Sequence, residues 1–468
     1  MYDKLLEVCG FEPEEIAEEM PRIERALRII GIDETGTEKA VAYINQYFDP
    51  ELIGFRKLRA VAVRELANLV LAREENEKVV YFTPTMIGGI ESFMLSGDNQ
   101  GDVYCQSPDL LLWMALGGIF GPWSLIPLLE AAEENGMRAG QAHCGAFQFK
   151  IGALAKEVIP KPDLLFTMGG MTCTQAGGAD TLAHELFDIP VAYVDGTDYP
   201  EGDTWPEISP RHITYAAETM RRCEDRFAEV TGVKISAEAQ KEGLVGAAKT
   251  LRPLLGLTEM RRKDPVPVGF QEVVLSYYLG VLPMHPDNRK RAIEATGMMA
   301  GEVKQRVENG QGIAPKGTPR IFFSFPPLSD ASLIGMVEKL GIVISGGGGM
   351  NLTAVEMKPP TIPAWEERSI EGIYRKGFWH NGISGGQAFL EQCRYLKVDG
   401  VVVANTVCCR LFNPCTPLQK ELLEKELGIP VLALESDVYD TRNYSTERLR
   451  SRMEAFAEIV KETAVAKH

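Results

Sequence analysis

The sequence predicts an α/β protein with two lobes whose parallel sheets face a central cleft. Short apolar runs alternate with helical segments over residues 79–206 and again over 318–468. Both stretches share one order: a buried run, a cysteine, a helix, and then Ile-Pro-Val opening the next run. Residues 1–78 and 207–317 carry apolar residues at helical spacing, which predicts an N-terminal helical layer and a helical connecting region.

In the first lobe, apolar runs bounded by turn residues predict three strands, at 78–83, 162–170 and 189–196. Helical spacing predicts helices at about 145–157 and 175–186. A strand, a helix and a strand at this spacing form a βαβ unit, so the sheet should be parallel.

The second lobe repeats this alternation. Its predicted strands lie at 319–325, 341–345, 399–405 and 429–436. Its predicted helices lie at about 330–340, 384–396, 416–427 and 445–463. The shared order of elements suggests a pseudo-duplicated pair of sheets, with ligands collecting beyond the carboxyl ends of the strands.

One stretch, residues 107–134, is long and apolar enough to suggest a membrane-spanning helix. Gly117-Gly118, Gly121-Pro122 and polar Ser124 should break it into two short helices, so we interpret it as buried. The acidic start of the chain has no apolar signal segment. We therefore expect a cytoplasmic protein without a membrane span.

Composition narrows the class of protein. The 468 residues carry a formal net charge of -16, which argues against a nucleic-acid binder, whose footprint is basic. The nine cysteines are an odd number and no signal segment accompanies them, which opposes a disulfide framework. Cys9, Cys223 and Cys393 fall in helical patterns, where we expect packed, unreactive thiols.

Three other cysteines share one context. Cys144 stands at the start of a predicted helix, whereas Cys173 and Cys409 each lie between a buried strand and the next helix. A helix N-terminus lowers the pKa of a thiol and prepares it to bind metal. Three convergent thiolates suit a soft-metal centre such as an iron–sulfur cluster. Two alternatives stay open: unrelated loop cysteines, and a structural zinc site, although the ligand spacing of closed zinc sites is absent.

The C-terminal stretches "KVDGVVVANTVCCRLFNP" and "LGIPVLALESDVYDTRNYSTERLRSRMEAFAE" resemble the 2-hydroxyacyl-CoA dehydratase and benzoyl-CoA reductase family. In that family a cluster cysteine follows the glycine of a buried Asp-Gly-Val strand by nine residues, which from Gly400 gives Cys409 rather than its neighbour Cys408. The acidic segment after the last strand is matched by Asp437, Asp440, Arg442 and Asn443.

Upstream, the stretch "KPDLLFTMGGMTCTQAGGADTLAHELFDIPVAYVDGTDYP" resembles a family unit with a cluster cysteine, which here is Cys173. The stretch "AHCGAFQFKIGALA" resembles the family segment with the first cluster cysteine, which here is Cys144. The resemblance covers about residues 120–468. These motifs are specific when taken together, although each alone would be weak. The chain departs from the pattern at Thr174, where an acidic residue or Asn is common, and in its long N-terminal layer. The extra cysteine pairs of the eight-iron branch are not evident, although Cys105 and Cys415 leave that partly open.

The resemblance implies a radical enzyme subunit with a [4Fe-4S] cluster on Cys144, Cys173 and Cys409, one iron being free of cysteine. An ATP-hydrolysing iron–sulfur activator protein would deliver one electron, and a related or identical second subunit would complete a dimer. The substrate would be an acyl-CoA: a 2-hydroxyacyl-CoA dehydrated to the 2-enoyl-CoA through a ketyl radical anion. The alternatives are a benzoyl-CoA reductase subunit and a non-catalytic electron-transfer protein with a closed cluster.

Weaker candidates accompany the cysteines. His143 could tune the cluster or relay protons, although a packed histidine is the plainer interpretation. Glycine-rich turns at 343–352 and 382–389 could line the acyl-CoA path, and Ser384 could cap the helix that follows it. Asp437, Asp440 and Arg442 are expected to form a structural loop network rather than a catalytic set.

Overall fold

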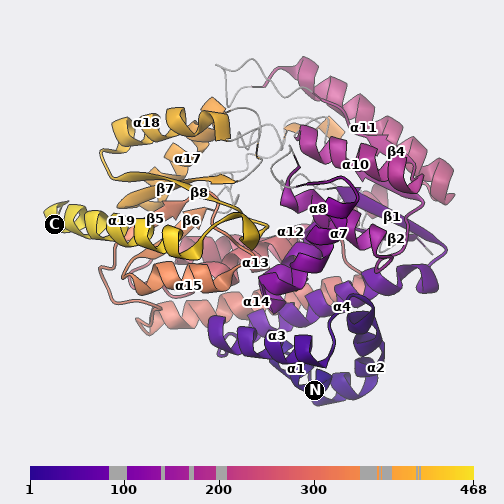
Figure 1. The fold of residues 1–468 in the computed structure, drawn as a ribbon, viewed down its shortest axis with the longest axis horizontal. Coiled ribbons are helices and arrows are strands. Elements are labelled where there is room, and N and C mark those ends of the chain that lie inside the picture. Colours follow the sequence, from indigo (N-terminus) through magenta and orange to yellow (C-terminus); the bar gives the residue numbers. More distant parts are fainter. Residues whose placement is uncertain are drawn as a thin grey trace.

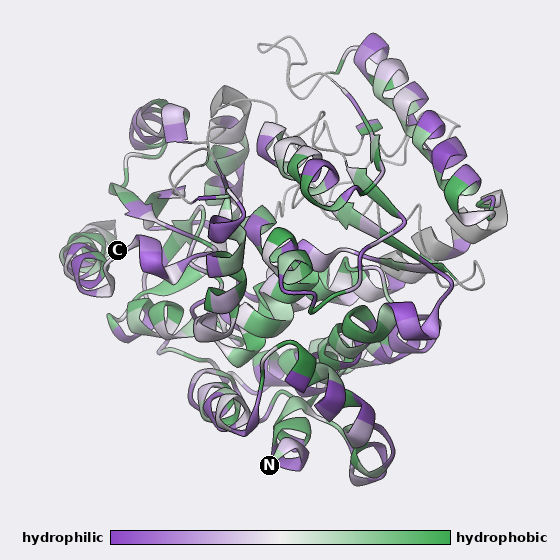
Figure 2. Cartoon of the chain, turned by 45° about the vertical axis from the view of Figure 1, so that its right-hand side comes forward, coloured by the Kyte–Doolittle hydropathy of each residue, from purple (hydrophilic) through white to green (hydrophobic). Residues whose placement is uncertain are grey.

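The computed structural model describes a chain in which two parallel sheets flank a helical middle (Figure 1). The described residues are 1–83, 103–138, 143–167, 173–196, 208–347, 366–367, 370–371, 382–406, 409 and 413–467. Hydrophobic residues prevail on the strands and central helices, and hydrophilic residues on the peripheral helices (Figure 2). In the described part, no helix has both the length and the apolar character needed to cross a membrane.

The N-terminal layer consists of four helices: α1 (Tyr2–Cys9), α2 (Pro13–Ile29), α3 (Glu34–Tyr47) and α4 (Ile53–Glu75). Helix α2 begins at a capping box made by Glu12 and Glu15, and α3 at Asp33, whose carboxylate accepts a hydrogen bond from the Gly36 amide. The layer docks on the rest of the chain, because α4 packs against the long helix α14 (Pro286–Glu308).

The first sheet contains four parallel strands in the order β2-β1-β3-β4. Its strands are β1 (Lys78–Thr83), β2 (Val103–Gln106), β3 (Leu164–Thr167) and β4 (Val191–Tyr193). Strand β2 was not predicted. Its helices are α6 (Pro108–Leu112), α7 (Ile126–Glu134), α8 (Gly145–Ala155) and α10 (Thr174–Phe187).

The apolar stretch at 107–134 is largely buried and divided into two helical parts, as predicted, but the division lies at Gly121-Pro122 and not at Gly117-Gly118. The helix runs on through Gly117-Gly118 as the π-helical segment η2 (Trp113–Phe120). It ends at Gly121, whose φ of 113° favours glycine, and the 3₁₀ turn η3 (Pro122–Leu125) then leads into α7.

The connecting region is helical, as predicted. It contains α11 (Pro210–Thr231), α12 (Ala237–Met260), α13 (Phe270–Gly280) and α14. Helix α11 ends at Gly232, which has a left-handed φ of 75°. In Figure 1, α13 and α14 lie between the two sheets and the N-terminal layer.

The second sheet has the parallel order β6-β5-β7-β8, which is the order of the first sheet repeated. Its strands are β5 (Arg320–Phe323), β6 (Val343–Gly347), β7 (Gly400–Thr406) and β8 (Val431–Ser436). Its helices are α15 (Ala331–Lys339), α17 (Gly382–Leu396), α18 (Thr416–Leu427) and α19 (Thr446–Lys467), with 3₁₀ turns η5 (Asn413–Cys415) and η6 (Thr441–Asn443). The predicted pseudo-duplication is therefore present in the strand order.

Candidate metal centre

Cys144 lies at the N-terminus of α8, where it occupies the N-cap with extended backbone angles (φ −88°, ψ 135°). Its side chain is buried. The next residue, Gly145, has no side chain, and a Cβ added there would lie 2.8 Å from the Cβ of Tyr439. This glycine therefore lets Tyr439 of the second lobe pack directly against the start of α8.

Cys173 and Cys409 occupy matching places in the two lobes, after the third strand of each unit. Cys173 is the N-cap of α10 and is half-buried. Cys409 is also half-buried; its amide donates to the Thr406 carbonyl (3.0 Å), and its own carbonyl accepts from the Asn413 amide (3.2 Å). The N-cap of α18 is Cys415, so Cys409 lies in the loop before that helix rather than at its start.

The three-thiol site (Cys144, Cys173 and Cys409) draws on both lobes. Burial raises the pKa of Cys144 well above its usual range, and the negative charges of Cys409, Cys173 and Asp437 raise it further. These charge effects connect Cys144 with both other cysteines and with the acidic segment after β8. The expected lowering of the pKa by the helix N-terminus is wrong for Cys144, because burial and the neighbouring negative charges outweigh it.

Aromatic residues cover one side of this site. The ring of Tyr439 packs edge-on against Trp113, with centroids 4.9 Å apart, and lies 6.5 Å from Phe149. The indole nitrogen of Trp113 donates to Ser329 Oγ (2.6 Å), which in turn donates to the Val438 carbonyl (3.0 Å). These contacts join buried side chains of η2 and α8 to the loop after β8.

The acidic segment after β8 forms a loop network, as expected. Asp437 accepts hydrogen bonds from the amides of Tyr439 and Asp440 and from Asn443 Nδ2, at 2.9, 3.2 and 2.9 Å. Burial raises the pKa of Asp437 to about 6. Arg442 pairs with Asp440 (2.9 Å) and reaches Glu133 on α7 (2.6 Å). The segment therefore holds Tyr439 in place and joins the two lobes.

The structure adds little to the case for the weaker candidates, His143 and Ser384. His143 is half-buried directly before Cys144. Ser384 is the third residue of α17, which begins at Gly382, so the expectation that Ser384 precedes and caps this helix is wrong. Cys408 lies outside the described residues, as does the part of the glycine-rich turn beyond Gly347.

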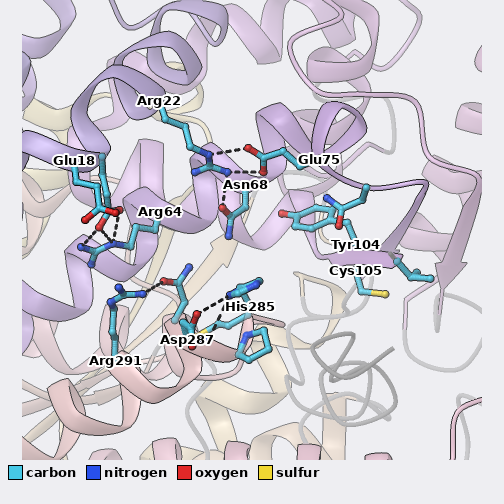
Figure 3. A pocket seen from close by; sticks show the side chains of 16 residues that line it. Glu18, Arg22, Arg64, Asn68, Glu75, Tyr104, Cys105, His285, Asp287 and Arg291 are labelled. Atoms are coloured by element: carbon cyan, nitrogen blue, oxygen red, sulfur yellow. Dashed lines mark hydrogen bonds and ion pairs between the residues drawn. The ribbon is translucent and has the colours of Figure 1, made fainter. Parts of the chain in front are cut away.

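Cys105 lies at a different site from Cys144, Cys173 and Cys409. It lies on β2 and lines a polar cavity of about 490 Å³ between the first sheet, the N-terminal layer and the start of α14 (Figure 3). Cys9, Cys223 and Cys393 are buried among apolar residues, as predicted, and burial raises the pKa of Cys9 to about 11 and that of Cys223 to about 12.

The possible metal ligands of this site are thiols. Within the described ranges, no group of three or more His, Cys, Asp or Glu side chains is close enough to hold a single metal ion. This gives no support to the zinc alternative, which needs its ligands around one ion. A [4Fe-4S] cluster binds each cysteine through a different iron, so its ligands stand further apart. In this chain Cys144 and Cys173 begin two different helices and Cys409 lies in a loop of the other lobe.

Several residues around the site were not predicted, namely Trp113, Tyr439, Ser329 and the buried ions described below. One signal was present: Lys150 is the single charged residue in the otherwise uncharged helix "GAFQFKIGALA". A lone charge in such a helix indicates a buried ion pair.

Comparison with known proteins places the chain in a family. The model of the 2-hydroxyglutaryl-CoA dehydratase D-component family matches residues 125–460. A benzoyl-CoA reductase subunit from Thauera aromatica is 23% identical over 262 residues, which is 50% of this chain and 56% of that protein. The alpha subunit of (R)-2-hydroxyglutaryl-CoA dehydratase from Acidaminococcus fermentans is 24% identical over 304 residues, or 64% of this chain and 61% of that protein.

The alpha subunit of (R)-phenyllactyl-CoA dehydratase from Clostridium sporogenes is 23% identical over 345 residues, covering 71% of this chain and 80% of that protein. The first two matches thus span less than two thirds of those relatives' lengths. The family model, by contrast, covers most of this chain and includes all three cysteines of the site. The chain belongs to the 2-hydroxyglutaryl-CoA dehydratase D-component family.

Proposed function

We propose that this chain is the iron–sulfur subunit of an ATP-activated radical enzyme that acts on CoA thioesters. In this proposal Cys144, Cys173 and Cys409 hold a [4Fe-4S] cluster that has one iron free of cysteine. The observation that carries the proposal is the place of the three thiols: Cys144 and Cys173 are the N-caps of two helices that pack against each other, and Cys409 follows the matching strand of the second lobe. Bound iron would stabilise the deprotonated form of these cysteines, which is the form that binds metal.

When bound, the cluster would supply low-potential single electrons and a Lewis-acidic iron for the thioester carbonyl. The residues of this chain would do the rest. Helices α8 and α10 present their positive N-terminal ends at Cys144 and Cys173, which favours negative charge at these sulfurs. Tyr439 and Trp113 keep water from one side of the site, which protects a reactive radical.

The reaction we propose is the reversible dehydration of a 2-hydroxyacyl-CoA to the 2-enoyl-CoA. Two of the matched relatives are alpha subunits of such dehydratases. The match to a benzoyl-CoA reductase subunit supports a second candidate, the reduction of an aromatic acyl-CoA. The two differ in electron demand, because dehydration returns the injected electron whereas reduction consumes two.

The proposed partners are an ATP-hydrolysing iron–sulfur activator and a related or identical second subunit that forms a dimer with this chain. The matched relatives are themselves named as subunits, which supports a multi-subunit assembly. The proposed compartment is the cytoplasm.

Turnover tests the radical assignment. The purified chain with its second subunit should convert a 2-hydroxyacyl-CoA only when an ATP-hydrolysing activator or a strong artificial reductant is present. Steady activity with a mild donor and no ATP would contradict a radical mechanism. Net electron consumption with benzoyl-CoA, and none with 2-hydroxyacyl-CoA, would select the reductase.

The open iron distinguishes an enzyme from an electron carrier. Adding a 2-hydroxyacyl-CoA or benzoyl-CoA should change the electron paramagnetic resonance spectrum, because the thioester oxygen replaces water or hydroxide at that iron. A cluster that ignores both compounds, in a chain that needs Cys415 or Cys105 to hold it, would identify the closed cluster of an electron-transfer protein.

A further inference from the structure

A buried group of ions lies beneath the three-thiol site. The side chain of Lys150 on α8 has no exposed surface, and its ammonium group contacts Asp180 on α10 and the Thr83 hydroxyl at the end of β1. Its third partner is Asp109 on α6, at 3.2 Å. Asp180 is likewise fully buried and accepts a hydrogen bond from Thr83 Oγ1 (2.8 Å). We call Lys150, Asp180, Asp109 and Thr83 the Lys150 ion cluster.

The protonation states of Lys150, Asp109 and Asp180 depend on one another. Burial alone would lower the pKa of Lys150, but Asp109 and Asp180 outweigh it and raise that pKa, so the ammonium form is kept. Burial raises the pKa of Asp109 to about 6 against the opposing effect of Lys150. A buried ion group of this kind adds little net stability compared with apolar side chains of similar size. A role in orienting structural elements is a more economical explanation for it.

The positions of these ions relative to the cysteines indicate what they orient. Lys150 follows Cys144 by six residues on α8, and Asp180 follows Cys173 by seven residues on α10. At 1.5 Å per helical residue, the contact lies about 9–10 Å along each helix from its N-cap cysteine. Helices α8 and α10 pack against each other, and the Lys150–Asp180 contact joins them at this depth. Thr83 ties the same point to the first sheet.

We propose that Lys150 and Asp180 are positioning residues for the iron–sulfur cluster. Their buried contact sets the separation of α8 and α10, and hence the separation of the Cys144 and Cys173 sulfurs. This inference rests on the proposed function, since it assumes that both sulfurs bind one cluster. Residues behind a metal ligand hold it in orientation, and their loss commonly lowers metal affinity about tenfold or more.

Asp180→Glu is the most informative variant, because it keeps the negative charge and lengthens the side chain at position 180 by one methylene group. The triple variant Lys150→Met/Asp180→Asn/Asp109→Asn removes the contact and leaves no unpaired charge in the Lys150 ion cluster. In both variants a chelator should remove iron about tenfold faster than from the unchanged protein, and the electron paramagnetic resonance line shape should change. The matched control is Arg64→Met, which breaks a nearly buried pair with Glu15 and Glu19 within the N-terminal layer. It should lower the free energy of unfolding yet leave iron release and line shape unchanged.

The iron-free chain gives a separate result. A short dithiol-specific cross-linker, followed by peptide mapping, should join Cys144 to Cys173 in the unchanged chain and do so with altered yield in Asp180→Glu. Equal cross-linking, iron release and line shape in all variants would overturn the positioning role. Absence of iron from the unchanged protein would instead contradict the proposed function, and the cross-linking comparison would still decide the positioning role.

Discussion

Gly152 on α8 shows how closely the helix behind Cys144 is packed. A Cβ at this position would overlap the backbone oxygen of Leu128 on α7, so an added methyl group must push the two helices apart. We expect Gly152→Ala to lower the free energy of unfolding by about 1–3 kcal/mol or more, measured by urea denaturation.

Gly178 on α10 is the matched control, because a Cβ there meets nothing within 4 Å. Alanine at this exposed helical position should raise stability by about 0.5–1 kcal/mol, since it restricts the unfolded chain and favours the helix. Equal effects of the two substitutions would show that α8 and α7 are not packed as described.

Glu224 on α11 should make stability depend on pH. Burial, and then repulsion from Glu366, raise its pKa from 4.5 to about 8. Between these values the folded chain binds more protons than the unfolded chain, so the free energy of unfolding falls as pH rises from 4.5 to about 8. Glu224→Gln should flatten this slope, whereas Glu218→Gln, at an exposed position of the same helix, should leave it unchanged. An unaltered slope in Glu224→Gln would contradict the burial of this carboxyl group.

At the scale of elements, Ser329 joins the π-helical segment η2 to the loop after β8. Its hydroxyl accepts from Trp113 Nε1 and donates to the Val438 carbonyl. Ser329→Ala should cost about 1–3 kcal/mol, because it leaves a buried indole donor without its acceptor. Urea denaturation measures this loss, and a change below about 0.5 kcal/mol, the size expected of a surface substitution, would mean that the link is not formed.

The elements themselves were largely predictable from local pattern. Strand β1 spans the predicted residues, and β3 to β8 lie within or close to theirs, since buried parallel strands are apolar runs between turn residues. Strand β2 was missed because its four residues carry too little periodicity. The π-helix was missed because Gly117 and Gly118 suggest a break, whereas here they allow close approach of Leu125 and Leu275.

On the scale of the whole molecule, the site depends on how the two lobes meet. The sequence singled out Cys144, Cys173 and Cys409 because cysteines at strand and helix ends form a recognisable local pattern. It could not predict Tyr439 against Gly145, the Trp113–Ser329 link or the Lys150–Asp180 contact, which join residues far apart in the chain. Such contacts follow from tertiary packing, which local periodicity does not encode.

Iron and acid-labile sulfide content after anaerobic purification tests the central claim most directly. The unchanged chain should hold about four of each, as a [4Fe-4S] cluster requires. Replacement of Cys144, Cys173 or Cys409 by Ala should remove or convert the cluster, whereas Cys223→Ala, in the buried face of α11, should keep it. A chain that holds no iron, or one that keeps its full iron in Cys409→Ala and loses it in Cys408→Ala, would contradict the proposed site.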